Sequence, residues 1–239
     1  MGALDRIRRR LAGARPPAPR EPEPAAPVAA AASPAEEARL WTVLRDDPND
    51  VQSFHALAEI VRARAEEGHE AGDPRKAADD AVWSLAEELA HSPRAWYPLI
   101  ELGRLSVHDD REQALRRLAT ASDRDPTGCG LAKAVQVLRE EGMPAEGLGL
   151  GVGHWHVPEH EVEVGRQLVL AAAEAGRPAD ARRMLDAMSA HPDTAKVAGM
   201  RAELQRAVDE AERVRAAGPA SGSIPVIDVR EKKLFKRSS

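Results

Sequence analysis

The residues best suited to chemistry in this sequence lie in one stretch, GLGLGVGHWHVPEHEVE, between Gly147 and Glu163. Glycine-rich loops bind phosphates when they join a strand to a helix and follow a G-x-G-x-x-G pattern. Here Val152 stands where the third glycine would fall, the residues before the stretch have a helical pattern, and no Lys-Ser or Lys-Thr pair follows. The stretch therefore matches neither a dinucleotide fingerprint nor a P-loop.

Three histidines at the end of this stretch are weak candidates for metal ligands. They are His154, His156 and His160, and two glutamates flank the last one. Imidazole and carboxylate groups bind Zn²⁺, and in an extended segment the first two histidines would point the same way. Histidines in an exposed turn explain the pattern equally, and no separate catalytic constellation accompanies them. We therefore predict no catalytic residues, no cofactor and no small-molecule substrate.

The glycines themselves admit a third interpretation, a degraded helix. Four glycines in a helix interior cost about 1 kcal/mol each relative to alanine, so only tight packing against neighbours would keep the segment helical. Otherwise residues 147–157 form an irregular or extended stretch that could pair with the strand-like sequence IPVIDV at residues 224–229. We predict a glycine-rich irregular stretch over 147–157 that acts as a point of flexibility.

A repeated spacing extends through the rest of the chain. A small residue is followed by leucine four residues later and by proline seven or eight residues after that, at intervals of roughly 33 residues after a longer first interval. The first occurrence has glutamate in the small-residue position and the fourth has glycine in the leucine position. The five sets are Glu36, Leu40 and Pro48; Ala81, Leu85 and Pro93; Ala114, Leu118 and Pro126; Gly147, Gly151 and Pro158; Ala181, Leu185 and Pro192. Such a period is typical of helix–turn–helix arrays, in which the leucine fills the core and the proline ends the helix.

The repeated segments resemble the tetratricopeptide repeat family. FHALAEIV at residues 54–61 matches that family's first-helix pattern, and Ala-x3-Leu-x7-Pro matches its second helix. The resemblance covers about residues 34 to 216, although the aromatic signature of the family is mostly replaced by leucine, alanine or glycine. It implies an all-α fold, a right-handed solenoid of helical hairpins that binds other proteins in a groove.

Composition and cysteine content agree with such a protein. Alanine, the best helix former, is abundant, and Cys129 is the only cysteine, which suits a reducing compartment. No apolar run is long enough to span a membrane, and prolines replace the apolar core that a secretory signal needs. We therefore expect a cytoplasmic protein.

The two ends of the chain differ from the body in charge. Residues 1–20 hold six arginines and one acid, residues 226–239 hold five basic and two acidic residues, and the net charge of −5 leaves an acidic body between them. We predict a basic amphipathic segment at 1–12, a Pro/Ala-rich disordered linker at 13–33, a repeat domain at 34–218 that ends in a capping helix at 193–216, and a basic tail at 219–239. The candidate basic contacts in these ends are Arg6, Arg8, Arg9, Arg10, Lys232, Lys233, Lys236 and Arg237.

The first helix of each repeat would line the groove of a solenoid, and its exposed positions are the candidate peptide-binding residues. They mix acidic, basic and amide groups, so they do not select a ligand charge. They are Gln52, His55, Glu59, Arg62, Gln136, Arg139, Glu163 and Arg166. The sequence favours a non-catalytic adaptor or scaffold for a protein or peptide partner. The alternative is a peripheral membrane-associated or nucleic-acid-associated protein, recruited by its basic ends to an anionic surface or an acidic partner.

Overall fold

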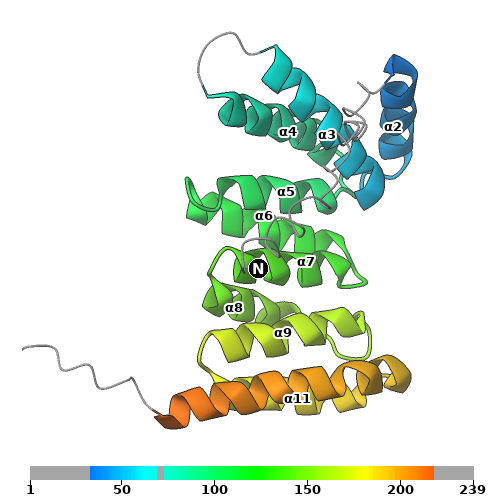
Figure 1. The fold of residues 1–239 in the computed structure, drawn as a ribbon. Helices are drawn as coiled ribbons and strands as arrows, with labels where there is room; N and C mark the ends of the chain where they lie inside the picture. Colours follow the sequence, from blue (N-terminus) through cyan, green and yellow to red (C-terminus); the bar gives the residue numbers. More distant parts are fainter. Residues whose placement is uncertain (1–32, 69–72, 218–239) are drawn as a thin grey trace, which may run out of the picture.

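The computed structural model describes residues 33–68 and 73–217, and these residues form an all-helical fold without strands (Figure 1). Ten α-helices and one short 3-10 turn follow one another along the described chain. The helices are α2 (Pro34–Asp46), α3 (Val51–Glu67), α4 (Pro74–Ala90), α5 (Tyr97–Ser106), α6 (Arg111–Arg124), α7 (Cys129–Glu140), α8 (Pro144–His154), α9 (Val162–Glu174), α10 (Pro178–Ala187) and α11 (Thr194–Ala217). The prediction of an all-α protein is confirmed. Within the described ranges, no helix combines the length and apolar character needed to cross a membrane.

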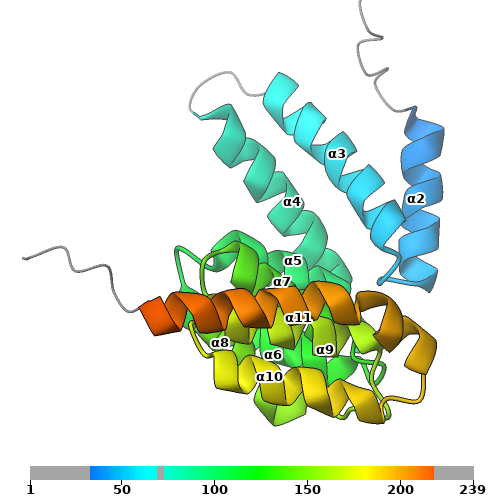
Figure 2. The same cartoon turned by 60° about the horizontal axis from the view of Figure 1, so that its bottom comes forward.

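The helices pack against their neighbours in pairs. α3 packs on α4, α5 on α6, α7 on α8 and α9 on α10, and each pair contacts the next through α4 and α5, α6 and α7, or α8 and α9. The first helices of successive pairs also contact one another, α5 with α7 and α7 with α9, and the last helix α11 continues this row by contacting α9. Figure 1 shows these pairs stacked from α2 and α3 at the top to α11 at the bottom, and Figure 2 shows α11 lying along α9 and α10.

The repeated spacing in the sequence marks α2 and the second helix of each pair. Leu40, Leu85, Leu118 and Leu185 are all buried in the core, at most 4 % exposed. Each proline of the pattern follows the end of one of these helices, where its missing N–H removes no helical hydrogen bond. At the start of the array, the hydroxyl of Ser33 accepts a hydrogen bond from the backbone N–H of Glu36, as an N-cap residue does.

The glycine-rich segment is a helix, so the prediction of an irregular stretch over 147–157 is wrong for residues 147–154. Two of its glycines are places of close packing. A methyl group on Gly147 would touch Leu138 of α7, and one on Gly151 would lie 2.0 Å from Cδ2 of Leu168 in α9. The side chain of Leu168 thus fills the space that a side chain at position 151 would need. Packing against α7 and α9 overrides the low helix propensity of glycine.

The 24-residue helix α11 extends from Thr194 to Ala217, where the sequence predicted a closing helix. Val197, Leu204 and Val208 bury one side of it, and they belong to the same core cluster as Leu168 of α9. Leu150 of α8 packs against both this cluster and the cluster of the preceding helices. The apolar core therefore continues along the described helices.

Candidate functional site

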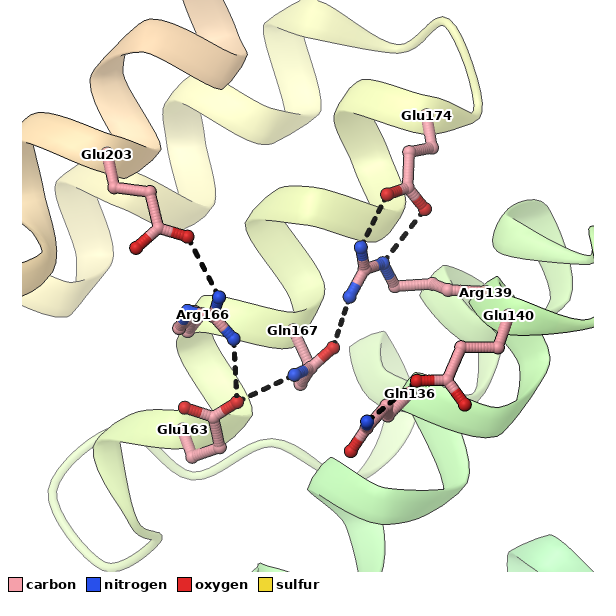
Figure 3. A network of polar contacts seen from close by, with 8 residues as sticks. All are labelled: Gln136, Arg139, Glu140, Glu163, Arg166, Gln167, Glu174 and Glu203. Atoms are coloured by element: carbon pink, nitrogen blue, oxygen red, sulfur yellow. Dashed lines mark hydrogen bonds and ion pairs between the residues drawn. The ribbon is translucent and has the colours of Figure 1, made fainter. Parts of the chain in front are cut away.

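The predicted groove residues lie on the first helices, and the structure divides them into two groups. Gln52, His55, Glu59 and Arg62 lie on α3, whereas Gln136 and Arg139 lie on α7 and Glu163 and Arg166 on α9. We call the surface formed by α3, α5, α7, α9 and α11 the first-helix face. On it, residues of α7, α9 and α11 join into one polar network (Figure 3).

Arg139 is the centre of this network. Its Nε donates a hydrogen bond to Glu174 at 2.8 Å and its Nη2 contacts the other oxygen of the same carboxylate, a bidentate ion pair between α7 and α9. Its Nη1 also contacts the amide oxygen of Gln167, a buried side chain of α9. The amide of Gln167 in turn donates to Glu163 at 2.6 Å. All three nitrogens of the Arg139 guanidinium thus contact a side chain of α9.

Arg166 links α9 to α11 in the same way. It donates to Glu163 at 3.1 Å and to Glu203 of α11 at 2.8 Å. These contacts, chiefly the hydrogen bond to Glu203, raise the pKa of Arg166 above its ordinary value. A ligand carboxylate would compete with Glu163 and Glu203 for this guanidinium. Both arginines therefore hold successive first helices together.

Gln136 completes the predicted set on α7. Its amide donates to Glu140 at 2.7 Å, one turn along the same helix, and its oxygen accepts from Lys133. These contacts stay within α7, so Gln136 lies beside the inter-helix network without joining it (Figure 3).

A second polar group joins α3 to α5 and includes residues that sequence reasoning missed. His55 Nε2 lies 2.8 Å from the Tyr97 hydroxyl, which donates to Glu101 at 3.0 Å. Because that hydroxyl has one proton, and Glu101 accepts it, His55 donates through Nε2. Arg104 donates two hydrogen bonds to the other Glu101 oxygen, at 3.0 and 2.6 Å.

Burial and the Glu101 carboxylate together shift the pKa values of Tyr97 and Arg104 in this second group. Burial, followed by the nearby Glu101 carboxylate, raises the pKa of the Tyr97 phenol far above its ordinary value. Burial opposes the charge of Arg104, but the contact with Glu101 outweighs it and raises the pKa of Arg104. The group therefore keeps Tyr97 protonated and Arg104 charged at neutral pH. Of the other predicted α3 residues, Glu59 pairs with Arg62 at 2.8 Å and Gln52 is exposed.

Beside the polar network, the first-helix face opens into an apolar hollow between the C-terminal halves of α9 and α11. It encloses about 440 Å³. We call it the α9–α11 hollow, and its lining consists of Leu170, Ala173, Glu174, Gly176, Ala207, Glu210, Ala211, Val214 and Arg215. Val214 is 62 % exposed, one of two large apolar side chains so exposed in the described part of the chain. Glu174 connects the hollow to the network through Arg139.

The candidate metal-binding histidines are used in other ways. His154 pairs with Asp123 of α6 at 3.2 Å, and His156 and His160 meet edge to face with ring centroids 5.5 Å apart. Burial, and then the neighbouring His156, lowers the pKa of His160. In residues 33–68 and 73–217, no three His, Cys, Asp or Glu side chains gather in a way that could hold a metal ion. The candidate basic contacts at the two ends of the chain lie outside the described residues.

The comparisons with known proteins add no family to these observations. Neither the protein-family models nor the curated proteins nor the solved structures gave a match to this chain. The resemblance to tetratricopeptide repeats therefore rests on the residue spacing, and the functional assignment rests on the geometry of the first-helix face.

Proposed function

We propose that this protein is a non-catalytic adaptor, in which stacked helical hairpins of the tetratricopeptide kind form a right-handed solenoid that binds a peptide segment of another protein. In such a solenoid the first helices line the concave side, so the polar network and the α9–α11 hollow would face a bound segment. The hollow would hold an apolar anchor of the ligand, and the network would keep its walls in place.

The observation that supports this proposal most is the combination of an open apolar hollow with walls that ion pairs link to neighbouring helices. Exposing Val214 to water forgoes the stabilisation that burying a valine gives, about 1.5–3 kcal/mol for a full side chain. The arginines at positions 139 and 166 hold α9 against both α7 and α11 before any ligand arrives. A preformed site loses less entropy when it binds than a site that must be ordered.

The chemistry of the face favours an aliphatic anchor over an acidic motif in the ligand. The floor of the hollow consists of leucine, valine and three alanines, which leave room for a side chain such as Leu, Ile or Val. Ligand acids would compete with Glu174 and Glu203 for Arg139 and Arg166. We therefore expect a segment with one or two aliphatic residues and no requirement for acidic groups.

Selection of peptides from a displayed random library on the full chain tests this function. Peptides that bind the hollow should share an aliphatic anchor and lose at least tenfold in affinity in Val214→Glu, which puts a charge into the hollow. Val152→Glu is the matched control, because Val152 on α8 is 61 % exposed and lies outside the hollow. A library that yields no binder, or binders equally sensitive to both variants, would argue against the adaptor function.

The charged ends favour a second candidate, recruitment to an anionic membrane or nucleic acid. Residues 1–20 have a net charge of +5 and residues 226–239 a net charge of +3. Attachment through these ends should weaken steeply as ionic strength rises, whereas binding in the apolar hollow should change little. Sedimentation with anionic vesicles at low and high salt distinguishes the two candidates.

A further inference from the structure

The α9–α11 hollow lies where the chain leaves its last helix. Arg215 lines the hollow, α11 ends at Ala217, and residues 218–239 follow directly. The other end of the described chain enters at α2, at the opposite end of the stack (Figure 1). The C-terminal segment is therefore the part of this chain outside the described residues that is tethered closest to the hollow.

The C-terminal segment has the composition that the hollow requires. IPVIDV at residues 224–229 contains four β-branched aliphatic residues, and VREKKLFKR follows from Val229 with five basic residues. The hollow offers an apolar floor, and at its edge the carboxylate of Glu174 pairs with Arg139 and that of Glu210 pairs with Arg213. Aliphatic side chains of the segment would therefore complement the apolar floor.

The connection between helix and segment is long enough for a return. GPASGS at residues 218–223 contains two glycines and a proline, residues that turns favour. Six extended residues span about 20 Å, whereas the helix from Ala217 back to Ala207 rises about 15 Å. Ile224 can therefore reach every turn of α11 that lines the hollow.

From these observations we propose that residues 224–229 occupy the α9–α11 hollow of their own chain and compete there with the partner peptide. The inference rests on the proposed function, since it takes the hollow to be the binding site. A short flexible linker gives the attached segment an effective concentration in the millimolar range. Even a weak contact, with an intrinsic dissociation constant of about 0.1 mM, would then occupy the hollow in about ten of every eleven molecules.

The test uses a fluorescein-labelled peptide of residues 219–239, titrated into the full chain by fluorescence anisotropy. In the wild type the attached segment competes with the added peptide, whereas Ile224→Asp together with Ile227→Asp removes the competitor. The double variant should therefore bind the peptide on the order of tenfold more tightly than the wild type. Adding Val214→Glu to the double variant should abolish binding, and adding Val152→Glu should leave it unchanged, with circular dichroism confirming that each variant is folded.

Three results would overturn intramolecular docking. The wild type and the double variant could bind the peptide equally, or Val214→Glu could have no effect on that binding. A concentration-dependent dimer that the double variant no longer forms would place the segment in the hollow of a second copy. The proposed function is judged separately: if library peptides bind the hollow and the C-terminal peptide binds no variant, the adaptor function stands and this inference fails.

Discussion

The two glycines Gly149 and Gly151 of α8 should respond in opposite ways to the same substitution. Nothing lies within 4 Å of a methyl group placed on Gly149, whereas one on Gly151 would lie 2.0 Å from Cδ2 of Leu168. Gly149→Ala should therefore raise the free energy of unfolding by about 0.5–1 kcal/mol, the helix-propensity gain alone. Gly151→Ala gains the same term but overpacks a fully buried leucine, which costs about 1–3 kcal/mol.

Both variants gain the same helix propensity, so the difference between their free energies of unfolding reports the packing of α8 against α9 alone. We expect Gly151→Ala to be less stable than Gly149→Ala by about 1–3 kcal/mol. Urea unfolding of the full chain, followed by circular dichroism and extrapolated to water, measures both values. In a Leu168→Ala background the clash disappears, so Gly151→Ala should become stabilising there. Equal stabilisation by the two substitutions in the wild type would refute the packing of Leu168 over Gly151.

Three further predictions concern the first-helix face and a turn. Arg139→Ala should lower the free energy of unfolding by about 1–2 kcal/mol, because Glu174 and the buried amide of Gln167 lose their partner. A double-mutant cycle of Arg139→Ala with Glu174→Gln should show a coupling energy of about 1 kcal/mol. Tyr97→Phe should cost about 1–2 kcal/mol at neutral pH in thermal or urea unfolding, since Glu101 loses a buried hydrogen bond. The pKa of the Tyr97 phenol is raised in the folded state, so the unfolded state releases this proton first as the pH rises. The free energy of unfolding of the wild type should therefore fall by about 1.4 kcal/mol per pH unit above pH ~10, and Tyr97→Phe should lack this decline. Gly128→Ala should lower the free energy of unfolding by about 1–2 kcal/mol or more, because φ is 83° at this residue and the new methyl group would lie 2.8 Å from the side chain of His160. An unchanged melting temperature would contradict this backbone geometry.

The helices were predictable where the signals are local. The repeated leucine and proline positions predicted α2 and the second helices, because each of these residues acts within one or two turns of its own helix. Pro98 falls in the first turn of α5, where proline is tolerated. Helix α8 could not be predicted in this way. Its glycines are accommodated in a helix because Gly147 packs closely against Leu138 of α7 and Leu168 of α9 fills the space above Gly151.

Three of the predicted groove residues, Arg139, Glu163 and Arg166, lie in the polar network, but their partners on neighbouring helices were not predicted. Arg139 and Arg166 were identified from helical spacing, yet their carboxylates lie 35 and 37 residues away in sequence and come close only through the stacking of α7, α9 and α11. Sequence spacing could have revealed the Glu101 and Arg104 pair, because residues three apart share one face of a helix.

The hollow was missed for a different reason. Ala207, Ala211 and Val214 form an apolar stripe at helical spacing, which the sequence shows. A stripe of this kind ordinarily indicates burial against a neighbouring helix. Only the structure shows that the end of α9 leaves part of this stripe uncovered, with Val214 exposed.

The central claim, that a partner peptide binds in the α9–α11 hollow, is tested most directly by methyl NMR of the full chain during titration with a library-selected peptide. Leu170 and Val214 line the hollow, and Val152 provides an equally exposed reference outside it. We predict that the methyl resonances of Leu170 and Val214 shift along one binding curve while those of Val152 stay in place. A peptide that binds without moving the Leu170 and Val214 resonances would contradict the claim.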